Sequence, residues 1–351
     1  MPALRNHHYV PQFYFRRFSR DGKSIAMLSR SSGKVVPQAA IKGQASKTGY
    51  YGDEEVESAL AELEGAAAAA LRRLDDASSP LAMSDEDIEF ILIHLSLQRS
   101  RTEAARQYGK ALHDKFTRLM LEVKIQNDTE LAEEKRQLLL GSLDCVEADP
   151  IHAQRMEMGV AVEHASKLGD LHPLLLRNTT NRPFIFSDAP VVFYNAFYAD
   201  VRHRGVLGYE TPGLMVFMPL SSSTCLALVD ARVYTVRGVR ENCVKVRELR
   251  DVLALNKLQV HSASHCVYFG EPRFSDYVQA AWEAERKRLT QHAGSVVEAP
   301  GRAIETGEDM GEILHGFQPQ LPYPLTLSFL KHEVRGDRHF AFSRRSEYPL
   351  T

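Results

Sequence analysis

Apolar residues recur every three or four positions between about residues 54 and 74, with charged side chains between them. The stripe consists of Val56, Leu60, Leu63, Ala67, Leu71 and Leu74. This period matches one face of a helix, and the alanine run at 66–70 strengthens the prediction because alanine has the highest helix propensity. A second helix is predicted to begin after the capping residue Ser84 and to run past Gln107. Further helical segments near 111–124, 129–141 and 150–167 complete a helical block over about 54–167.

From about residue 171 the apolar residues form short continuous runs instead. The segments 174–179, 183–186, 214–218 and 225–229 are typical of buried strands. A helix is predicted at 247–260, a strand at 266–269, and another helix around 280–289 before a weakly patterned tail. Residues 7–51 are predicted to be irregular, with short strands at 24–28 and 34–36.

The segregation of helical and strand runs decides the fold class. We predict an α+β fold in which the helical block packs against a mostly antiparallel or mixed sheet. One α+β domain is assigned to residues 1–270, with its helical part at 54–167 and its sheet part at 171–270. A C-terminal extension over 271–351 is predicted to pack on the same domain.

Charge and cysteine usage narrow the class of protein. The chain has 43 basic and 45 acidic residues, so no overall positive charge favours a nucleic-acid or membrane surface. Its four cysteines lie far apart without a Cys-x-x-Cys pair, which argues against a zinc knuckle or a disulfide framework. No apolar run marks a signal peptide or approaches the roughly 20 residues of a membrane helix. We predict a soluble cytoplasmic protein without membrane contact.

Two histidines open the aromatic-rich segment 6–18. Pro11 restricts Val10 to an extended conformation, so this segment is expected to be anchored in the core beyond the histidines. His8 is the candidate catalytic acid or base, because histidine exchanges a proton near neutral pH, and Gln12 is a candidate substrate-binding residue. In the alternative interpretation His8 satisfies a buried carbonyl and His7 is solvated.

The first helix carries two acids beside its apolar stripe. Glu57 and Glu64 are two turns apart and project from the same side, so they are candidate ligands for a divalent cation, Mg²⁺ or Mn²⁺. Glu64 is also a candidate catalytic residue. The stretch just before this helix adds Lys47 as a catalytic candidate and Tyr51 as a substrate-binding candidate. The alternative is that these glutamates simply favour the helix.

The inward face of the second helix ends in polar residues. Extending the face of Ile91 and Leu95 by one turn reaches Gln98 and Arg99, and a guanidinium there suits a phosphate or a carboxylate. Arg99 is equally suited to a structural salt bridge with Glu57 or Glu64. The following residues Arg101 and Arg106 are interpreted as solvated.

Two polar residues in the second half are further candidates. Asp188 follows the strand at 184–186 and is a catalytic and metal-binding candidate, with turn formation as the alternative. Asn256 interrupts an apolar helix face, so it either ties down a loop or orients a substrate-binding site. His261 and His265 have the spacing of a zinc helix, but no acid follows His261 and no third ligand is evident.

Several of these residues occur in one order that resembles the domain-of-unknown-function family 4238. The likeness rests on His8-Tyr9-Val10-Pro11-Gln12-Phe13-Tyr14 with Phe18, Tyr50-Tyr51 before Glu57 and Glu64, Phe184-x-Phe186-Ser187-Asp188-x-Pro190, Met218-Pro219-Leu220-Ser221 and Leu255-Asn256. It covers roughly residues 5–270, and Phe15 stands where an aliphatic residue is expected. The resemblance implies a stand-alone microbial protein and brings no activity or cofactor with it.

Three hypotheses for function remain open. The leading one is a nuclease-like hydrolase of a phosphodiester or nucleotide, with His8 as acid or base, the three acids on a metal ion, and Lys47 or Arg99 on the phosphate. Its rival is a non-catalytic protein whose buried polar network shapes a pocket for a ligand or partner. The third, ADP-ribosyl transfer by His8, Tyr51 and Glu64, rests on residue types alone.

Overall fold

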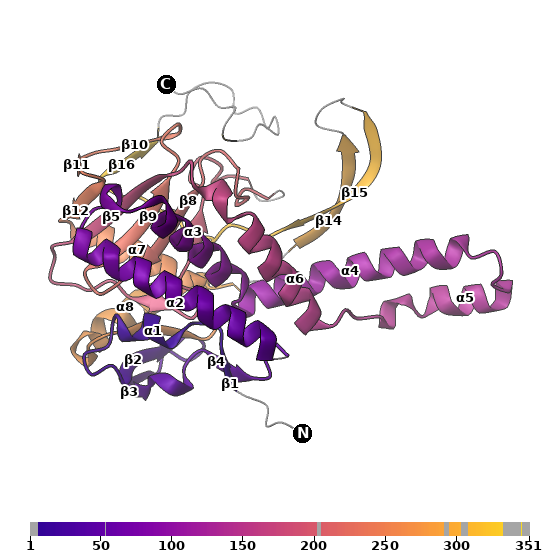
Figure 1. Ribbon diagram of the computed structural model, residues 1–351, viewed down its shortest axis with the longest axis horizontal. Coiled ribbons are helices and arrows are strands. Elements are labelled where there is room, and N and C mark those ends of the chain that lie inside the picture. The colour runs from indigo at the N-terminus through magenta and orange to yellow at the C-terminus, as the bar shows by residue number, and fades with distance from the viewer. Residues whose placement is uncertain are drawn as a thin grey trace.

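The computed structural model describes residues 6–52, 54–201, 205–290, 295–302, 308–332 and 345. Helices and sheets form separate layers around one large core, and two hairpins project from this body (Figure 1). The helices are α1 (Gln12–Arg16), α2 (Glu54–Ala77), α3 (Asp85–Ser100), α4 (Glu103–Asn127), α5 (Glu133–Gly141), α6 (Pro150–Glu163), α7 (Leu249–Ser262) and α8 (Ser275–Glu285). The predicted helical block is therefore present as α2 to α6.

The central sheet has six strands in the order β11-β12-β5-β9-β8-β7. They are β5 (His172–Asn178), β7 (Val192–Tyr194), β8 (Met215–Pro219), β9 (Thr224–Val229), β11 (Val239–Arg240) and β12 (Cys243–Val246). All of its pairs are antiparallel except β12 with β5. The α+β prediction with a mixed sheet is confirmed.

A second, four-stranded sheet joins the two halves of the chain. Its order is β3-β2-β13-β6, with β2 (Ser24–Ser29) and β3 (Val35–Ala40) from the N-terminal part beside β6 (Phe186–Ser187) and β13 (Cys266–Phe269). The short strands predicted near residues 24 and 34 thus belong to a sheet with strands of the second half. A smaller antiparallel pair, β1 (Asn6–His8) with β4 (Ser46–Thr48), lies on the same side of the molecule as β2 and β3.

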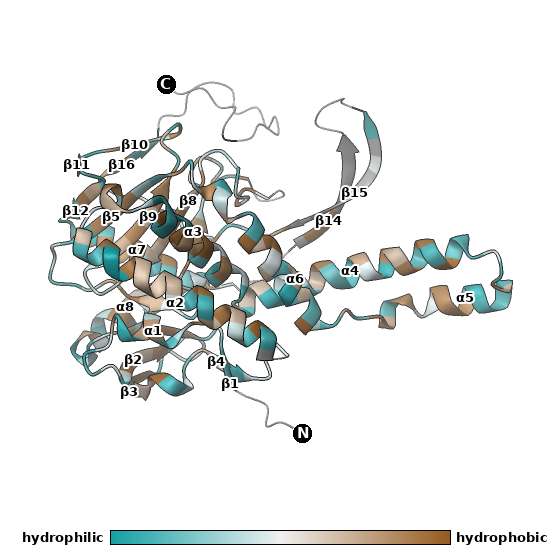
Figure 2. Cartoon of the chain, viewed as in Figure 1, coloured by the Kyte–Doolittle hydropathy of each residue, from teal (hydrophilic) through white to brown (hydrophobic). Residues whose placement is uncertain are grey.

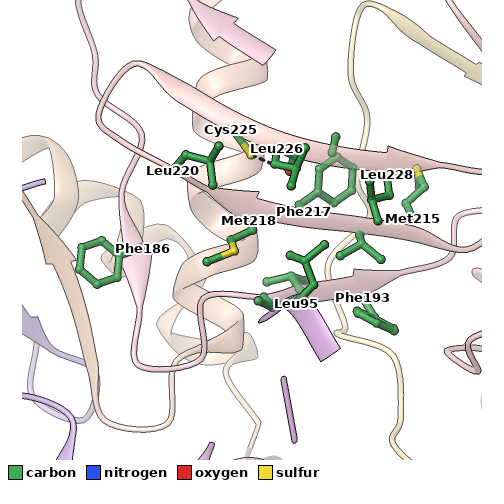
Figure 3. Packing of buried hydrophobic residues seen from close by; sticks show 14 of the residues in the cluster. Leu95, Phe186, Phe193, Met215, Phe217, Met218, Leu220, Cys225, Leu226 and Leu228 are labelled. Carbon is green, nitrogen blue, oxygen red and sulfur yellow. Dashed lines mark hydrogen bonds between the residues drawn. The ribbon is translucent and has the colours of Figure 1, made fainter. Parts of the chain in front are cut away.

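The core fills the space between the central sheet and helices α2 and α3. Strand β8 is buried along its whole length, as expected where both sheet faces are covered. Figure 3 shows Leu95 of α3 near Phe193 of β7 and side chains of β8 and β9, while Phe186 extends the cluster toward the second sheet. Burial of this many apolar side chains supplies the main driving force for folding.

The α3–α4 connection departs from the predicted continuous helix. Helix α3 ends at Ser100, Arg101 leaves helical geometry with ψ of 5°, and Thr102 caps a new helix by accepting a hydrogen bond from the Ala105 amide at 3.2 Å. The prediction that one helix runs past Gln107 was wrong because Thr102 followed by Glu103 is a helix start. This break redirects the chain after Arg101, whereas Arg101 itself still donates its amide to the Leu97 carbonyl at 3.1 Å and lies one turn after Gln98 on the same side.

The C-terminal segment also contains structure that the sequence did not predict. Strands β14 (Ser295–Arg302) and β15 (Asp309–Phe317) form an antiparallel hairpin, and β16 (Leu330–His332) pairs with β10 (Tyr234–Val236). The backbone amide of Ser328 donates to Asp251 of α7 at 2.8 Å, and Arg345 forms an ion pair with Asp170. Within the described residues, no helix is long and apolar enough to cross a membrane.

Candidate functional site

Strand β1 directs the two N-terminal histidines to opposite sides. Because side chains alternate along a strand, His7 is buried with 5% exposure whereas His8 is only partly buried. His8 Nε2 lies 3.0 Å from the Lys42 carbonyl oxygen and 3.4 Å from Gln12 Nε2. The interpretation of His7 as solvated was wrong. His8 contacts a carbonyl, but an exposed one rather than the buried one that the structural alternative called for.

His7 stands at the centre of a polar group between the first segment and α2. Its Nδ1 accepts a hydrogen bond from the Tyr51 amide at 3.0 Å, and its ring stacks on Tyr51 at 5.6 Å. A neutral His7 therefore carries its proton on Nε2, and this nitrogen lies 3.7 Å from Glu57 Oε2. Among the described residues, that buried carboxylate oxygen has no hydrogen-bond partner.

Arg101 completes this group from the α3–α4 connection. Its side chain is fully buried, donates from Nη1 to Glu64 Oε1 at 2.6 Å, and donates from Nε and Nη2 to Gln98 Oε1 at 3.0 and 2.7 Å. Gln98 Nε2 in turn donates to the Tyr9 carbonyl at 2.9 Å. Burial lowers the pKa of Arg101, but Glu64 and Tyr51 together more than offset this and hold the pKa above its ordinary value. We call this set the buried network: His7, Tyr51, Glu57, Glu64, Gln98 and Arg101.

The interpretation of Arg101 and Arg106 as solvated was wrong. Arg106 donates to the Tyr50 carbonyl at 2.9 Å and to Gln154 Oε1 at 3.1 Å, and its guanidinium lies over the Tyr50 ring. Arg106 follows the helix break, so the phase of α3 does not apply to it, whereas Arg101 is the C-terminal cap of α3 and lies one turn after Gln98. The sequence signal that was available is Thr102 followed by Glu103, a capping residue and an acid in a first helical turn.

Arg99 points to a different place, a cavity of about 330 Å³. Its guanidinium lies 4.0 Å from the centre of the Phe193 ring and donates to Gln318 Oε1 at 2.8 Å. Burial lowers the pKa of Arg99, although a guanidinium stays charged in proteins. Among the described residues, no carboxylate lies within 4 Å of it in an ion pair, so the salt bridge considered with Glu57 or Glu64 is not formed.

The rest of the cavity wall is neutral. Its polar members are Arg99, Thr102, Ser262, Thr290, Gln318 and Gln320. The other lining side chains are alanine, valine, leucine, proline and Phe193. The described wall thus holds one cation, hydroxyls and amides, but no Asp, Glu, His, Lys or Cys. We call this the Arg99 cavity.

Asp188 and Asn256 are occupied by backbone groups. The Asp188 carboxylate accepts hydrogen bonds from the amides of Ser264 and His265, both at 2.8 Å; burial raises the pKa of this carboxyl and the two amides oppose the shift. Asn256 accepts from the Ile185 amide and donates to the Pro183 carbonyl. These contacts hold the segment 183–190 against α7 and its C-terminal turn.

The three acids proposed as metal ligands are not gathered. Glu57 and Glu64 belong to the buried network, whereas Asp188 lies at the C-terminal turn of α7. Within the described part of the chain, no group of three or more His, Cys, Asp or Glu side chains has the geometry to hold a metal ion. The predicted arrangement does not form because Arg101 neutralises Glu64 and backbone amides take the Asp188 oxygens.

Two further candidates pair with acids. Lys47 is partly exposed and its Nζ lies 2.5 Å from Glu103 Oε2. His261, considered with His265 for zinc, contacts Glu285 of α8 at 3.0 Å, and Lys257 contacts the other oxygen of Glu285 at 2.7 Å. The sequence did not suggest this acid because it lies 24 residues beyond His261.

Comparison with known proteins gives one match. A family model described as Protein of unknown function (DUF4238) matches residues 6–273. The chain belongs to this family. No curated protein and no solved structure matches it.

Some of the candidate residues lie inside the region that the DUF4238 model matches, and others lie beyond it. All of the buried network and the wall of the Arg99 cavity up to Ser262 fall inside it, whereas Thr290 and the lining residues from 318 to 322 lie beyond residue 273. The sequence predicted Gln98, Arg99, Glu57, Glu64 and Tyr51, but not His7, Arg101, Gln318 or Gln320. No pattern in the tail marked the two glutamines.

Proposed function

We propose that the chain binds a small anionic ligand with an apolar body, such as a nucleotide, in the Arg99 cavity, without hydrolysing it. The observation that carries this proposal is a partly buried guanidinium at the cavity wall whose described partners are neutral: the Gln318 amide oxygen, the Tyr209 hydroxyl and the Phe193 ring. Pockets for small molecules are typically apolar, with a few polar groups that orient the ligand. The Arg99 cavity has this composition.

The charge of Arg99 specifies the ligand's polar end. A planar guanidinium binds phosphate or carboxylate through paired, charge-assisted hydrogen bonds. The amides of Gln318 and Gln320 and the hydroxyl of Thr102 offer additional neutral contacts, and Phe193 with the valine and proline side chains suits a flat or apolar body. A nucleoside monophosphate has both parts, as does an aromatic carboxylate.

The absence of an acid–base group favours binding over hydrolysis. General acid–base catalysis requires a proton-transferring side chain within reach of the reacting atoms, and the described wall supplies only hydroxyls, amides and a guanidinium. Ser262 Oγ donates to the Ala189 carbonyl at 2.6 Å, so its proton is already engaged.

A metal-dependent phosphodiesterase or nuclease is the second candidate. The observation in its favour is the buried Glu57 oxygen without a partner among described residues, 3.7 Å from His7 Nε2. Such a carboxylate has spare capacity for a proton or for Mg²⁺ or Mn²⁺. Nucleic acid would then be a substrate.

We also propose a cytoplasmic location, supported by four free cysteines.

The experiment is calorimetric titration of the full chain with four probes: AMP, adenosine, inorganic phosphate and benzoate. AMP is expected to bind more tightly than adenosine or phosphate alone, and benzoate tests whether a carboxylate replaces the phosphate. Arg99→Gln is expected to weaken binding about tenfold or more, because a hydrogen bond to a charged group contributes roughly 1.5–3 kcal/mol. The matched control, Arg72→Gln on the exposed face of α2, should leave binding unchanged.

Two outcomes contradict the binding proposal. One is equal affinity for the anionic probes in wild type and Arg99→Gln. The other is turnover of AMP or of a phosphodiester in the presence of Mg²⁺ or Mn²⁺, which would support the second candidate. In that event His8→Ala and His7→Ala identify which histidine the reaction requires.

A further inference from the structure

Helix α4 exposes an apolar stripe along the projecting helical hairpin. Phe116 is 52% exposed, Leu119 43%, Met120 55% and Val123 48%. Spacings of three, one and three residues place all four on one face of the helix. Figure 2 shows hydrophobic residues along α4 where it extends from the body beside α5. A row of four large apolar side chains at this exposure is more than scattered surface residues provide.

The segment that returns from α5 toward α6 packs on the opposite face of α4. Asp114 accepts a hydrogen bond from the Ala148 amide at 2.7 Å, and Arg118 donates to the Val146 carbonyl at 2.9 Å. These residues point about half a turn away from Phe116 and Val123, at 100° per residue. The stripe is therefore not the inner face of the α4–α5 hairpin.

Among the described residues, the β14–β15 hairpin covers the same face near its base. A Cβ added to Gly316 of β15 would lie 2.8 Å from Leu112 Cδ1, so the β14–β15 hairpin sits directly against Leu112. Leu112 lies one turn before Phe116 on the stripe. The apolar face thus begins under the β14–β15 hairpin and continues into solvent.

Charge placement along the stripe specifies the occupant. Phe116, Leu119 and Val123 follow the a-d-a spacing of a heptad, which puts both Lys115 and Glu122 at g positions on the same flank. In an antiparallel pair of identical helices, g positions of one copy face g positions of the other. Lys115 of each copy then lies opposite Glu122 of the other, and the two contacts are related by a two-fold axis.

We propose that two copies of this chain associate through α4, antiparallel, about a two-fold axis near residues 117 and 118. In this arrangement Phe116 packs against Leu119 of the second copy, and Met120 closes the interface on the other flank. Glu122 is able to take part, since its described partner is the neutral Gln126 amide at 3.2 Å. The proposal does not depend on the Arg99 cavity.

Sedimentation velocity and light scattering over a concentration series test this arrangement. The wild type is expected to be a dimer in the micromolar range, and Leu119→Glu is expected to raise the dissociation constant at least about tenfold, because it puts a charge into an apolar contact. The matched control is Leu138→Glu on α5, a side chain that is 73% exposed and lies off the stripe. Circular dichroism establishes that each variant is folded.

Charge reversal distinguishes the antiparallel pair from any other use of the stripe. Lys115→Glu and Glu122→Lys are each expected to weaken association severalfold, and the double variant is expected to restore it, because the reversed charges meet again across the axis. A wild type that stays monomeric up to about 100 μM overturns the proposal. So does a double variant that associates more weakly than either single variant.

Discussion

The buried network and the Arg99 cavity are built from neighbouring residues at the C-terminal end of α3, but the arginines in the two regions have different partners. Gln98 and Arg101 turn toward the N-terminal segment, where Arg101 is paired with Glu64 and Gln98. Arg99, between them, turns toward the cavity and meets a glutamine amide and Phe193. A satisfied buried cation holds structure together, whereas a cation with only neutral partners retains capacity for an anion. One helical step of about 100° separates Arg99 from Gln98, and Arg101 returns to the side of Gln98 about one turn later.

The largest effect is expected when the satisfied cation is removed. Arg101→Met leaves Glu64 and Gln98 without their partner, so the free energy of unfolding should fall by about 3–5 kcal/mol, as for other broken buried pairs. Arg99→Gln removes a charge without a described carboxylate partner and should change stability by less than about 1 kcal/mol. Urea unfolding of both variants measures the contrast.

The double variant Glu64→Gln with Arg101→Met sharpens this test. Removing both charges together should recover much of the lost stability, because no uncompensated carboxylate remains. Equal destabilisation by Arg99→Gln and Arg101→Met would contradict the division between network and cavity.

A second effect is expected on the pH dependence of stability. It comes from His94, which lies on the side of α3 that faces the buried network. Burial, with Arg101 and Arg17 nearby, lowers the pKa of His94 to about 3. The unfolded chain binds a proton at His94 below about pH 6.5, while the folded chain does not until about pH 3. Stability should therefore be intact above pH 6.5 and fall by up to about 1.4 kcal/mol per pH unit as the pH drops through this window.

The comparison that isolates His94 is wild type against His94→Leu. Acidic side chains such as Asp87 and Asp114 also have lowered pKa values and weaken the fold in acid, but they are common to both proteins. The difference in urea midpoint between the two should shrink or reverse as the pH falls from 7 to 5. A difference that is constant with pH would show that the pKa of His94 is the same in the folded and the unfolded chain.

The sequence was informative where periodicity decides structure and misleading where a single residue breaks it. The α2 stripe and the buried runs of β8 and β9 predicted the helical block and the sheet, because burial on one face leaves a repeating pattern. The partner of Arg101, Glu64, lies on another helix 37 residues away, and Gln318 reaches the cavity through a long-range chain path. Neither leaves a local pattern, so the partners of Arg99 were not predictable from its own helix.

The smallest effect separates the two adjacent histidines of β1. His7 accepts the Tyr51 amide in a buried position, and His7→Ala leaves that donor unsatisfied, which costs about 1–3 kcal/mol. His8 is only partly buried, and its contact with the Lys42 carbonyl is at the surface, so water replaces it in His8→Ala and the loss should be below about 1 kcal/mol. Urea unfolding at pH 7.5, where both histidines are neutral when unfolded, gives the two values. If His8→Ala proves the more damaging, the strand presents its side chains in the opposite sense and His8 belongs to the buried network.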